Sequence, residues 1–210
     1  MPAPALPSLA THEAPPGKHF TRAEVQHMLD CGLFAGDRYE LIHGDLTDKT
    51  GQNPPHAAGV RKLMKVFAAI FGADRILVQL PIEAGSTDSD RSLPEPDVAV
   101  LKQSSDEYED RHPRGDELML VVEVSDTTAL QDSTIKRDLY ARAGVPDYWV
   151  LDVSKRALRI HRCLSNGLYG EVTDLGHNDV ARFDSEPGAI IPVADLLPKQ
   201  NRFSSDRPQH

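Results

Sequence analysis

The run LMLVVEV at residues 118–124 is the strongest strand signal in the chain. A segment that is apolar at consecutive positions is typical of a strand buried on both faces, so both sides of its sheet must be covered. Strand patterns and helical patterns alternate around this run, and strands are in the majority. The sequence therefore predicts an α/β or α+β fold, with one mixed central sheet flanked by helices.

Periodicity and capping signals predict the other elements. The capping box Thr21-x-x-Glu24 predicts a short helix that ends at Gly32. A second helix should follow Pro54–Pro55, because Val60, Leu63, Met64, Phe67 and Phe71 share one helical face. Further helices are expected over residues 133–143 and 193–197, and strands over 38–46 (a hairpin around a Gly-Asp turn), 76–82, 98–101, 148–153, 157–163 and 168–175.

The length of 210 residues suits one domain, which we expect over residues 19–197. Residues 1–18 contain five prolines and are expected to be a flexible lead, because proline blocks helix interiors. Residues 198–210 are polar and are expected to be a flexible tail. The chain has neither a signal-peptide pattern nor the ~18 consecutive apolar residues of a membrane helix, so we expect no membrane association.

The charge balance limits the partners. The chain has 23 basic and 32 acidic residues, a net charge of −9. A protein that binds nucleic acid mainly through its overall electrostatic field would carry a positive net charge instead. Any contact with nucleic acid would need a cation or a local basic surface, such as the one that Arg61, Lys62 and Lys65 form beside the apolar helix face. Two distant cysteines, Cys31 and Cys163, exclude a cysteine-rich zinc site and a disulfide framework, so we expect a cytoplasmic protein.

Three polar residues do not fit the structural pattern. Glu123 interrupts the most apolar strand, unless the strand ends there and Glu123 meets water. Asp97 precedes the apolar run at 98–101, where it is a site residue or a turn aspartate. Lys136 lies at the edge of an inward helical stripe, where it either pairs with Asp132 or points into a site.

Two further residues are ambiguous in the same way. Glu40 is a buried acid or an edge residue, and His56 at a helix start is structural or belongs to the site. The acids lie on separate strands and a lysine follows on the next helix, so one shared site that binds a cation would explain all of these residues. Two carboxylates ~4 Å apart repel by about 1–4 kcal/mol, and a divalent cation turns that penalty into affinity. Oxygen ligands favour Mg²⁺ or Mn²⁺, which can polarise a phosphodiester while an ammonium steadies the developing charge.

Three runs carry a resemblance to a known family: YELIHGDL, PEPDVAV and VVEVSDTTALQDSTIKRDLYARAGVPDYWVLD. Together they resemble the Uma-type restriction endonucleases of the PD-(D/E)XK nuclease superfamily, over roughly residues 20–165. The last run, with its D-x-x-x-K spacing and its AGVPDYW ending, is the most specific part. The resemblance implies a restriction-endonuclease-like core and a Mg²⁺-dependent site that hydrolyses phosphodiester bonds of DNA.

The resemblance also implies roles for individual residues. Asp97 matches the aspartate of the P-D element, and Glu123 matches the acid of the (D/E)-x-K element. These two would hold the metal together with the backbone carbonyl of Val124. Glu40 matches the upstream acid of YELI and would be the third catalytic acid.

The lysine departs from the superfamily pattern. Two residues after Glu123 the chain has Ser125, and the Uma pattern places the catalytic lysine on the next helix, where Lys136 matches it. His56 matches a common helix-start histidine and is a second-rank candidate.

Two functions remain open from the sequence. The first is a metal-dependent DNA endonuclease, acting as a homodimer because cutting both strands of a duplex needs two sites. The alternative is a catalytically inactive nuclease-like scaffold that binds nucleic acid or a protein partner, because a fold does not dictate activity.

Overall fold

The computed structural model describes residues 17–34, 36, 38–49, 53–125, 130–183, 186 and 188–199, except the side chains of residues 130–133. Most of the expected lead and tail lies outside these residues. One six-stranded sheet organises the described chain. Its strands are β3 (Ile76–Val78), β4 (Val98–Leu101), β5 (Leu118–Ser125), β6 (Tyr148–Asp152), β7 (Ala157–Ser165) and β8 (Leu168–Gly176), in that spatial order.

The sheet is mixed, as the sequence predicts. All neighbouring strands pair antiparallel except β5 and β6, which are parallel and are joined through helix α3 (Leu130–Ala143). Strand β5 lies inside the sheet, and all of its residues except Met119 and Ser125 are buried. The apolar run therefore forms a central strand covered on both faces.

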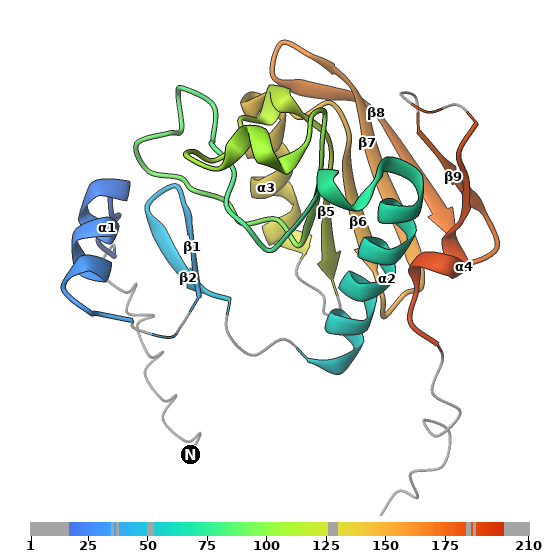
Figure 1. Cartoon of the computed structure of the whole chain (residues 1–210), viewed down its shortest axis with the longest axis horizontal. Coiled ribbons are helices and arrows are strands. Elements are labelled where there is room, and N and C mark those ends of the chain that lie inside the picture. The colour runs from blue at the N-terminus through green and yellow to red at the C-terminus, as the bar shows by residue number, and fades with distance from the viewer. Residues whose placement is uncertain are drawn as a thin grey trace, which may run out of the picture.

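Helices cover the two faces of the sheet. Helix α2 (Pro54–Phe71) and the short α4 (Val193–Leu196) pack on one face, around a core that includes Phe67 and Trp149. Helix α3 covers the other face, where Tyr140 and Tyr148 pack against Val121. Figure 1 shows α2 and α3 on opposite sides of β5. None of the described helices is long and apolar enough to cross a membrane.

The N-terminal elements form a smaller unit beside the sheet (Figure 1). Helix α1 (Arg22–Asp30) begins with the expected capping box, in which both reciprocal bonds between Thr21 and Glu24 are made. It is followed by a hairpin of β1 (Tyr39–Ile42) and β2 (Asp45–Asp48). A bridge from Leu41 to Leu93 ties the hairpin to the segment before β4. The remaining elements are β9 (Val180–Arg182) paired with β10 (Ile190–Pro192), and short 3-10 turns at Ala73–Arg75, Ser105–Tyr108 and Gly115–Glu117.

Several boundaries differ from the sequence-based expectations. The strand expected over residues 76–82 ends at Val78, because Gln79 adopts a left-handed conformation with φ of 53°. The hairpin turn falls on His43–Gly44 rather than on Gly44–Asp45, since Asp45 already pairs with Ile42. Helix α3 starts three residues earlier than expected.

Two residues assigned to inward helical stripes are exposed. Met64 is 42% exposed and Ile135 is 46% exposed. Each lies at the border of its apolar stripe, where periodicity does not separate the covered side of a helix from the open side.

Candidate active site

Three polar residues lie side by side at one end of the sheet. Val98 pairs with Val122 and with Val78, so continuing both registers by one residue places Asp97 between Glu123 on β5 and Gln79 after β3. The Gln79 N–H donates to the carbonyl oxygen of Asp97 at 3.2 Å, which supports this placement. Side chains directly opposite in an antiparallel pair lie on the same face of the sheet. The two acids expected from the sequence are therefore neighbours.

Asp97 is buried, and both of its carboxylate oxygens have polar neighbours. Its Oδ2 accepts from the Val124 N–H at 2.8 Å and lies 3.1 Å from His56 Nε2. Its Oδ1 lies 3.5 Å from Gln79 Nε2. Burial raises the pKa of Asp97, but the His56 hydrogen bond, the charge of Lys49 and the Val124 N–H outweigh it and leave this pKa below its ordinary value. Asp97 is thus held as a buried carboxylate in the bend that precedes β4.

Glu123 is also buried, which contradicts the interpretation that its strand ends there in water. Lys136 Nζ donates to Glu123 Oε1 at 3.0 Å, and the Tyr140 hydroxyl donates to the same oxygen at 2.7 Å. Burial raises the pKa of Glu123 above its ordinary value, although Lys136 opposes this effect. Burial and the charge of Glu123 raise the pKa of Tyr140 well above its ordinary range, so the phenol remains a hydrogen-bond donor.

Lys136 joins two of the expected acids. Its Nζ lies 2.8 Å from Glu40 Oε2 as well as 3.0 Å from Glu123 Oε1. Burial lowers the pKa of Lys136, but the charges of Glu123 and Glu40 outweigh it and hold this pKa well above its ordinary value. Lys136 therefore points into the site as an ammonium. The alternative partner, Asp132, has a side chain outside the described part of the chain.

Glu40 comes from the hairpin and is buried, which answers the question that the sequence left open. Its Oε1 accepts from the Glu95 N–H at 2.9 Å, and its Oε2 lies 3.8 Å from Lys49 Nζ. The hairpin thus delivers both Glu40 and Lys49 to the edge of the sheet. His56 comes from the first turn of α2 and contacts Asp97. The Asn53 side chain caps this helix, because it accepts a hydrogen bond from the His56 N–H at 3.0 Å.

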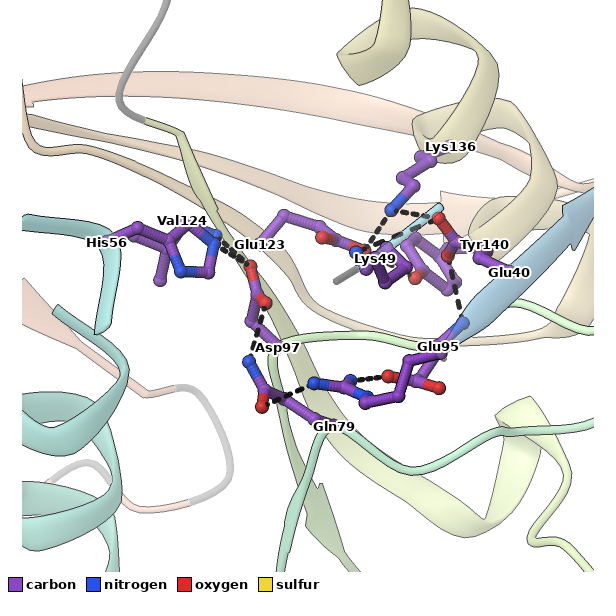
Figure 2. Close-up of polar contacts among 11 residues, drawn as sticks. Glu40, Lys49, His56, Gln79, Glu95, Asp97, Glu123, Val124, Lys136 and Tyr140 are labelled. Carbon is purple, nitrogen blue, oxygen red and sulfur yellow. Dashed lines mark hydrogen bonds and ion pairs between the residues drawn. The ribbon is translucent and has the colours of Figure 1, made fainter. Parts of the chain in front are cut away.

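Figure 2 shows the resulting cluster. Asp97 lies near His56 and Gln79, and Glu123 lies near Lys136 and Tyr140. Sequence reasoning missed several members of the cluster. Tyr140 is one turn after Lys136 on the inward stripe of α3, so helical spacing could have identified it. Glu95 stands two residues before Asp97, but nothing in the sequence marks it or Gln79. Arg38 completes this side, with an ion pair to Glu95 and a 2.9 Å bond to Gln79 Oε1.

The donor set fits a hard divalent cation only if the backbone takes part. Among the described residues, no three His, Cys, Asp or Glu side chains are placed so that they could hold a metal by themselves. The register of β4 and β5 places Pro96 opposite Val124, and proline has no N–H to donate to the Val124 carbonyl. Two carboxylates and a carbonyl are oxygen ligands of the kind that Mg²⁺ accepts, with water completing the shell.

The charges of the cluster are nearly balanced. Four carboxylates, from Glu40, Glu95, Asp97 and Glu123, face three cations, from Arg38, Lys49 and Lys136. The acids therefore outnumber the lysine and arginine cations of the cluster by one. Such an arrangement can attract a cation, and it places a charged lysine beside the acids, where it can donate to a water or to an anionic oxygen.

Comparisons with known proteins identify a family and a similar fold. A family model, Uma2, described as "Putative restriction endonuclease", matches residues 23–194. The fold is similar to a crystal structure described as a "putative nuclease belonging to DUF820" from Anabaena variabilis, with a TM-score of 0.65 and 14% sequence identity. That match covers 84% of this chain and 97% of the other, and at this identity it supports the fold alone. No curated protein sequence matches the chain.

Proposed function

The chain belongs to the Uma2 family, described as "Putative restriction endonuclease", and from this premise we propose that it is an endonuclease that hydrolyses DNA phosphodiester bonds with Mg²⁺ or Mn²⁺. The observation that carries the proposal is the contact of Lys136 with Glu123, next to Asp97 on the neighbouring strand. Acid, acid and lysine are the groups of a PD-(D/E)XK nuclease site, with the lysine supplied by α3 instead of β5.

The division of labour follows from the chemistry of the side chains. Asp97, Glu123 and the Val124 carbonyl would hold the cation, which when bound polarises the phosphodiester and lowers the pKa of a water. Lys136 has no lone pair as an ammonium, so it cannot be a ligand. Its protons at Nζ can instead orient the attacking water or neutralise charge on a phosphate oxygen.

The remaining residues position these groups. Glu40 accepts from Lys136 Nζ at 2.8 Å and so keeps the ammonium charged and directed at Glu123. His56 lies 3.1 Å from Asp97 Oδ2 and favours the ionised form of Asp97. We therefore expect loss of His56 to weaken the reaction less than loss of either acid.

The direct test is cleavage of plasmid and linear DNA in the presence of Mg²⁺ or Mn²⁺. Wild-type protein should cut, whereas the Asp97→Asn and Glu123→Gln variants should lose at least 10²-fold in rate, roughly the effect of removing general acid–base or charge-stabilising groups. Asp174→Asn is the matched control, because Asp174 is an exposed acid paired with Arg159 away from the cluster. Equal rates for all four proteins would refute the assignment of the site.

One observation favours the alternative function. Glu40 and Glu123 already have cationic partners in Lys49 and Lys136, so these two carboxylates are charge-compensated without a metal, as a binding scaffold would require. A calorimetric titration separates the two possibilities. Absence of Mg²⁺ and Mn²⁺ binding at millimolar concentrations, together with absence of cleavage, would replace the nuclease with the inactive scaffold.

The expected homodimer is part of the same proposal. Two sites related by two-fold symmetry could cut both strands of a duplex in one encounter. Light scattering at high protein concentration tests this. A clean monomer would contradict the dimer and would favour nicking of single strands.

A further inference from the structure

The side of α2 that faces away from the sheet carries three cations and no acid. Residues 54–71 read PPHAAGVRKLMKVFAAIF, without Asp or Glu. Arg61 and Lys65 are exposed and Lys62 is half-buried. The opposite side of the helix is apolar and is buried against the sheet through Val60, Leu63 and Phe67. We call Arg61, Lys62 and Lys65 the α2 basic face.

The α2 basic face is not explained by the stability of the helix. Arg61 and Lys65 are four residues apart, and Lys62 and Lys65 are three apart, so the charges are neighbours on the helix surface. Like charges at these spacings destabilise a helix by about 0.2–0.5 kcal/mol per pair. All three lie in the middle of α2, where the helix dipole favours neither sign of charge.

No acid in the described part of the chain compensates for this repulsion. The side chains of Arg61, Lys62 and Lys65 make no ion pair or hydrogen bond with any described residue. Other exposed arginines do have acidic partners, such as Arg159 with Asp174 and Arg111 with Glu117. In a chain with a net charge of −9, an uncompensated basic cluster indicates an anionic partner.

The same helix is fixed to the candidate active site. Its first turn brings His56 to within 3.1 Å of Asp97. A Cβ at Gly59 would lie 3.0 Å from Val124 and 3.2 Å from Val153, so the helix packs closely on the ends of β5 and β6. At 1.5 Å per residue, Arg61 lies about 7.5 Å along the helix axis from His56. The α2 basic face therefore begins one to two turns beyond the site along the helix axis, on the side of α2 that faces away from the sheet.

We infer that the α2 basic face binds the phosphate backbone of the nucleic acid that enters the candidate site, an inference that rests on the proposed function. The axial distance from Arg61 to Lys65 is about 6 Å, which corresponds to about two phosphates of one strand, since each adds roughly 3.4 Å along the duplex axis. Such contacts carry no sequence information, but they set the register of the duplex on the protein. The α2 basic face is the local surface that an acidic protein needs in order to hold a polyanion.

The test is the salt dependence of binding, measured without cleavage. A short labelled DNA duplex is titrated in EDTA by fluorescence anisotropy, at salt concentrations between about 50 and 200 mM. The variant carries Arg61→Gln, Lys62→Gln and Lys65→Gln. Its slope of log K against log salt should be smaller by about 2–3, because each lost phosphate contact removes about 0.9.

The matched control is Arg159→Gln, which removes an exposed cation that already has a partner. The control should keep the wild-type slope. The triple variant should unfold at the same temperature as wild type or slightly higher, because it loses only repulsion. A helix that melts earlier would be recognised in this measurement, and single variants would then replace the triple.

The outcomes separate this inference from the proposed function. If wild type binds DNA and the triple variant binds it with the same slope, the inference is wrong and the nuclease proposal is unaffected. If wild type binds neither duplex nor single-stranded DNA at low salt, the proposed function is wrong, and the inference that rests on it is wrong as well. If the triple variant loses binding to polyglutamate but not to DNA, the partner is an acidic protein and the inference is overturned.

Discussion

Lys136→Met tests the reasoning about the charge cluster most directly. The side chain of Lys136 is 12% exposed, and its ammonium contacts Glu40 at 2.8 Å and Glu123 at 3.0 Å. Methionine keeps most of the volume but leaves the two carboxylates facing one another without this cation. Removing one partner of a buried ion pair costs about 3–5 kcal/mol of folding stability. Lys49 remains near Glu40 and Tyr140 still donates to Glu123, so we expect the lower end of that range, about 3 kcal/mol.

The loss should depend on pH in a defined direction. Without Lys136, the pKa of Glu123 in the folded state should rise further above its unfolded value. A carboxyl with a raised pKa is least costly to the fold when it is protonated, so its penalty grows as the pH rises through that raised pKa. The stability deficit of Lys136→Met should therefore be largest at pH 7–8 and should shrink towards pH 5. Mg²⁺ should also restore stability if the acids bind it, by about 2.7 kcal/mol at a concentration one hundred times its Kd.

The assay is urea unfolding, followed by the fluorescence of Trp149, which is the single tryptophan of the chain and is fully buried. Lys155→Met is the control, because Lys155 is 60% exposed in its pair with Asp152 and should cost less than about 1 kcal/mol. A deficit for Lys136→Met below about 1 kcal/mol, or one that is equal at pH 5 and pH 8, would refute the reasoning.

Three further predictions concern single side chains. Asp97→Asn should abolish Mg²⁺ and Mn²⁺ binding in calorimetry whereas Lys136→Met should retain it, and metal binding by the Asp97 variant would exclude Asp97 as a ligand. Tyr140→Phe removes a donor to the ionised form of Glu123, so the acidic limb of the pH–rate profile should move to higher pH, and an unchanged profile would mean that Tyr140 only fills space. Burial, with the charges of nearby arginines, lowers the pKa of His161 from 6.5 to about 4, so this residue should cost stability as the pH falls between these values. His161→Phe should flatten that decline in urea unfolding at pH 7 and pH 4.5, and an equally steep decline would contradict it.

The elements of the fold were largely predictable from local sequence. The continuous apolar run of β5 required cover on both faces, and the capping box of α1 and the apolar spacing of α2 marked two helices. These signals are local, because they depend on burial pattern and on backbone hydrogen bonding within a few residues. Boundaries were less predictable. Nothing in the composition of residues 76–82 announced that Gln79 would turn left-handed and end β3.

The candidate site shows the same division between local and tertiary information. The sequence, through its resemblance to a family, singled out Glu40, Asp97, Glu123, Lys136 and His56, since each is a polar residue in an apolar or helix-start setting. Only the tertiary structure decided their partners. The strand register set Asp97 beside Glu123, and the hairpin placed Glu40 between Lys49 and Lys136.

The physical reason lies in the range of the forces. The apolar pattern of a helix or strand involves residues that are close together along the chain, so it can be read directly from the sequence. The charge state of a buried acid depends on which cations and hydrogen-bond donors contact it in space. Lys136 contacts Glu123, 13 residues away in the sequence, and Glu40, 96 residues away. The sequence alone therefore determined which side chains needed an explanation. The packed sheet, hairpin and helices decided that Glu123 meets Lys136 and Tyr140 instead of water.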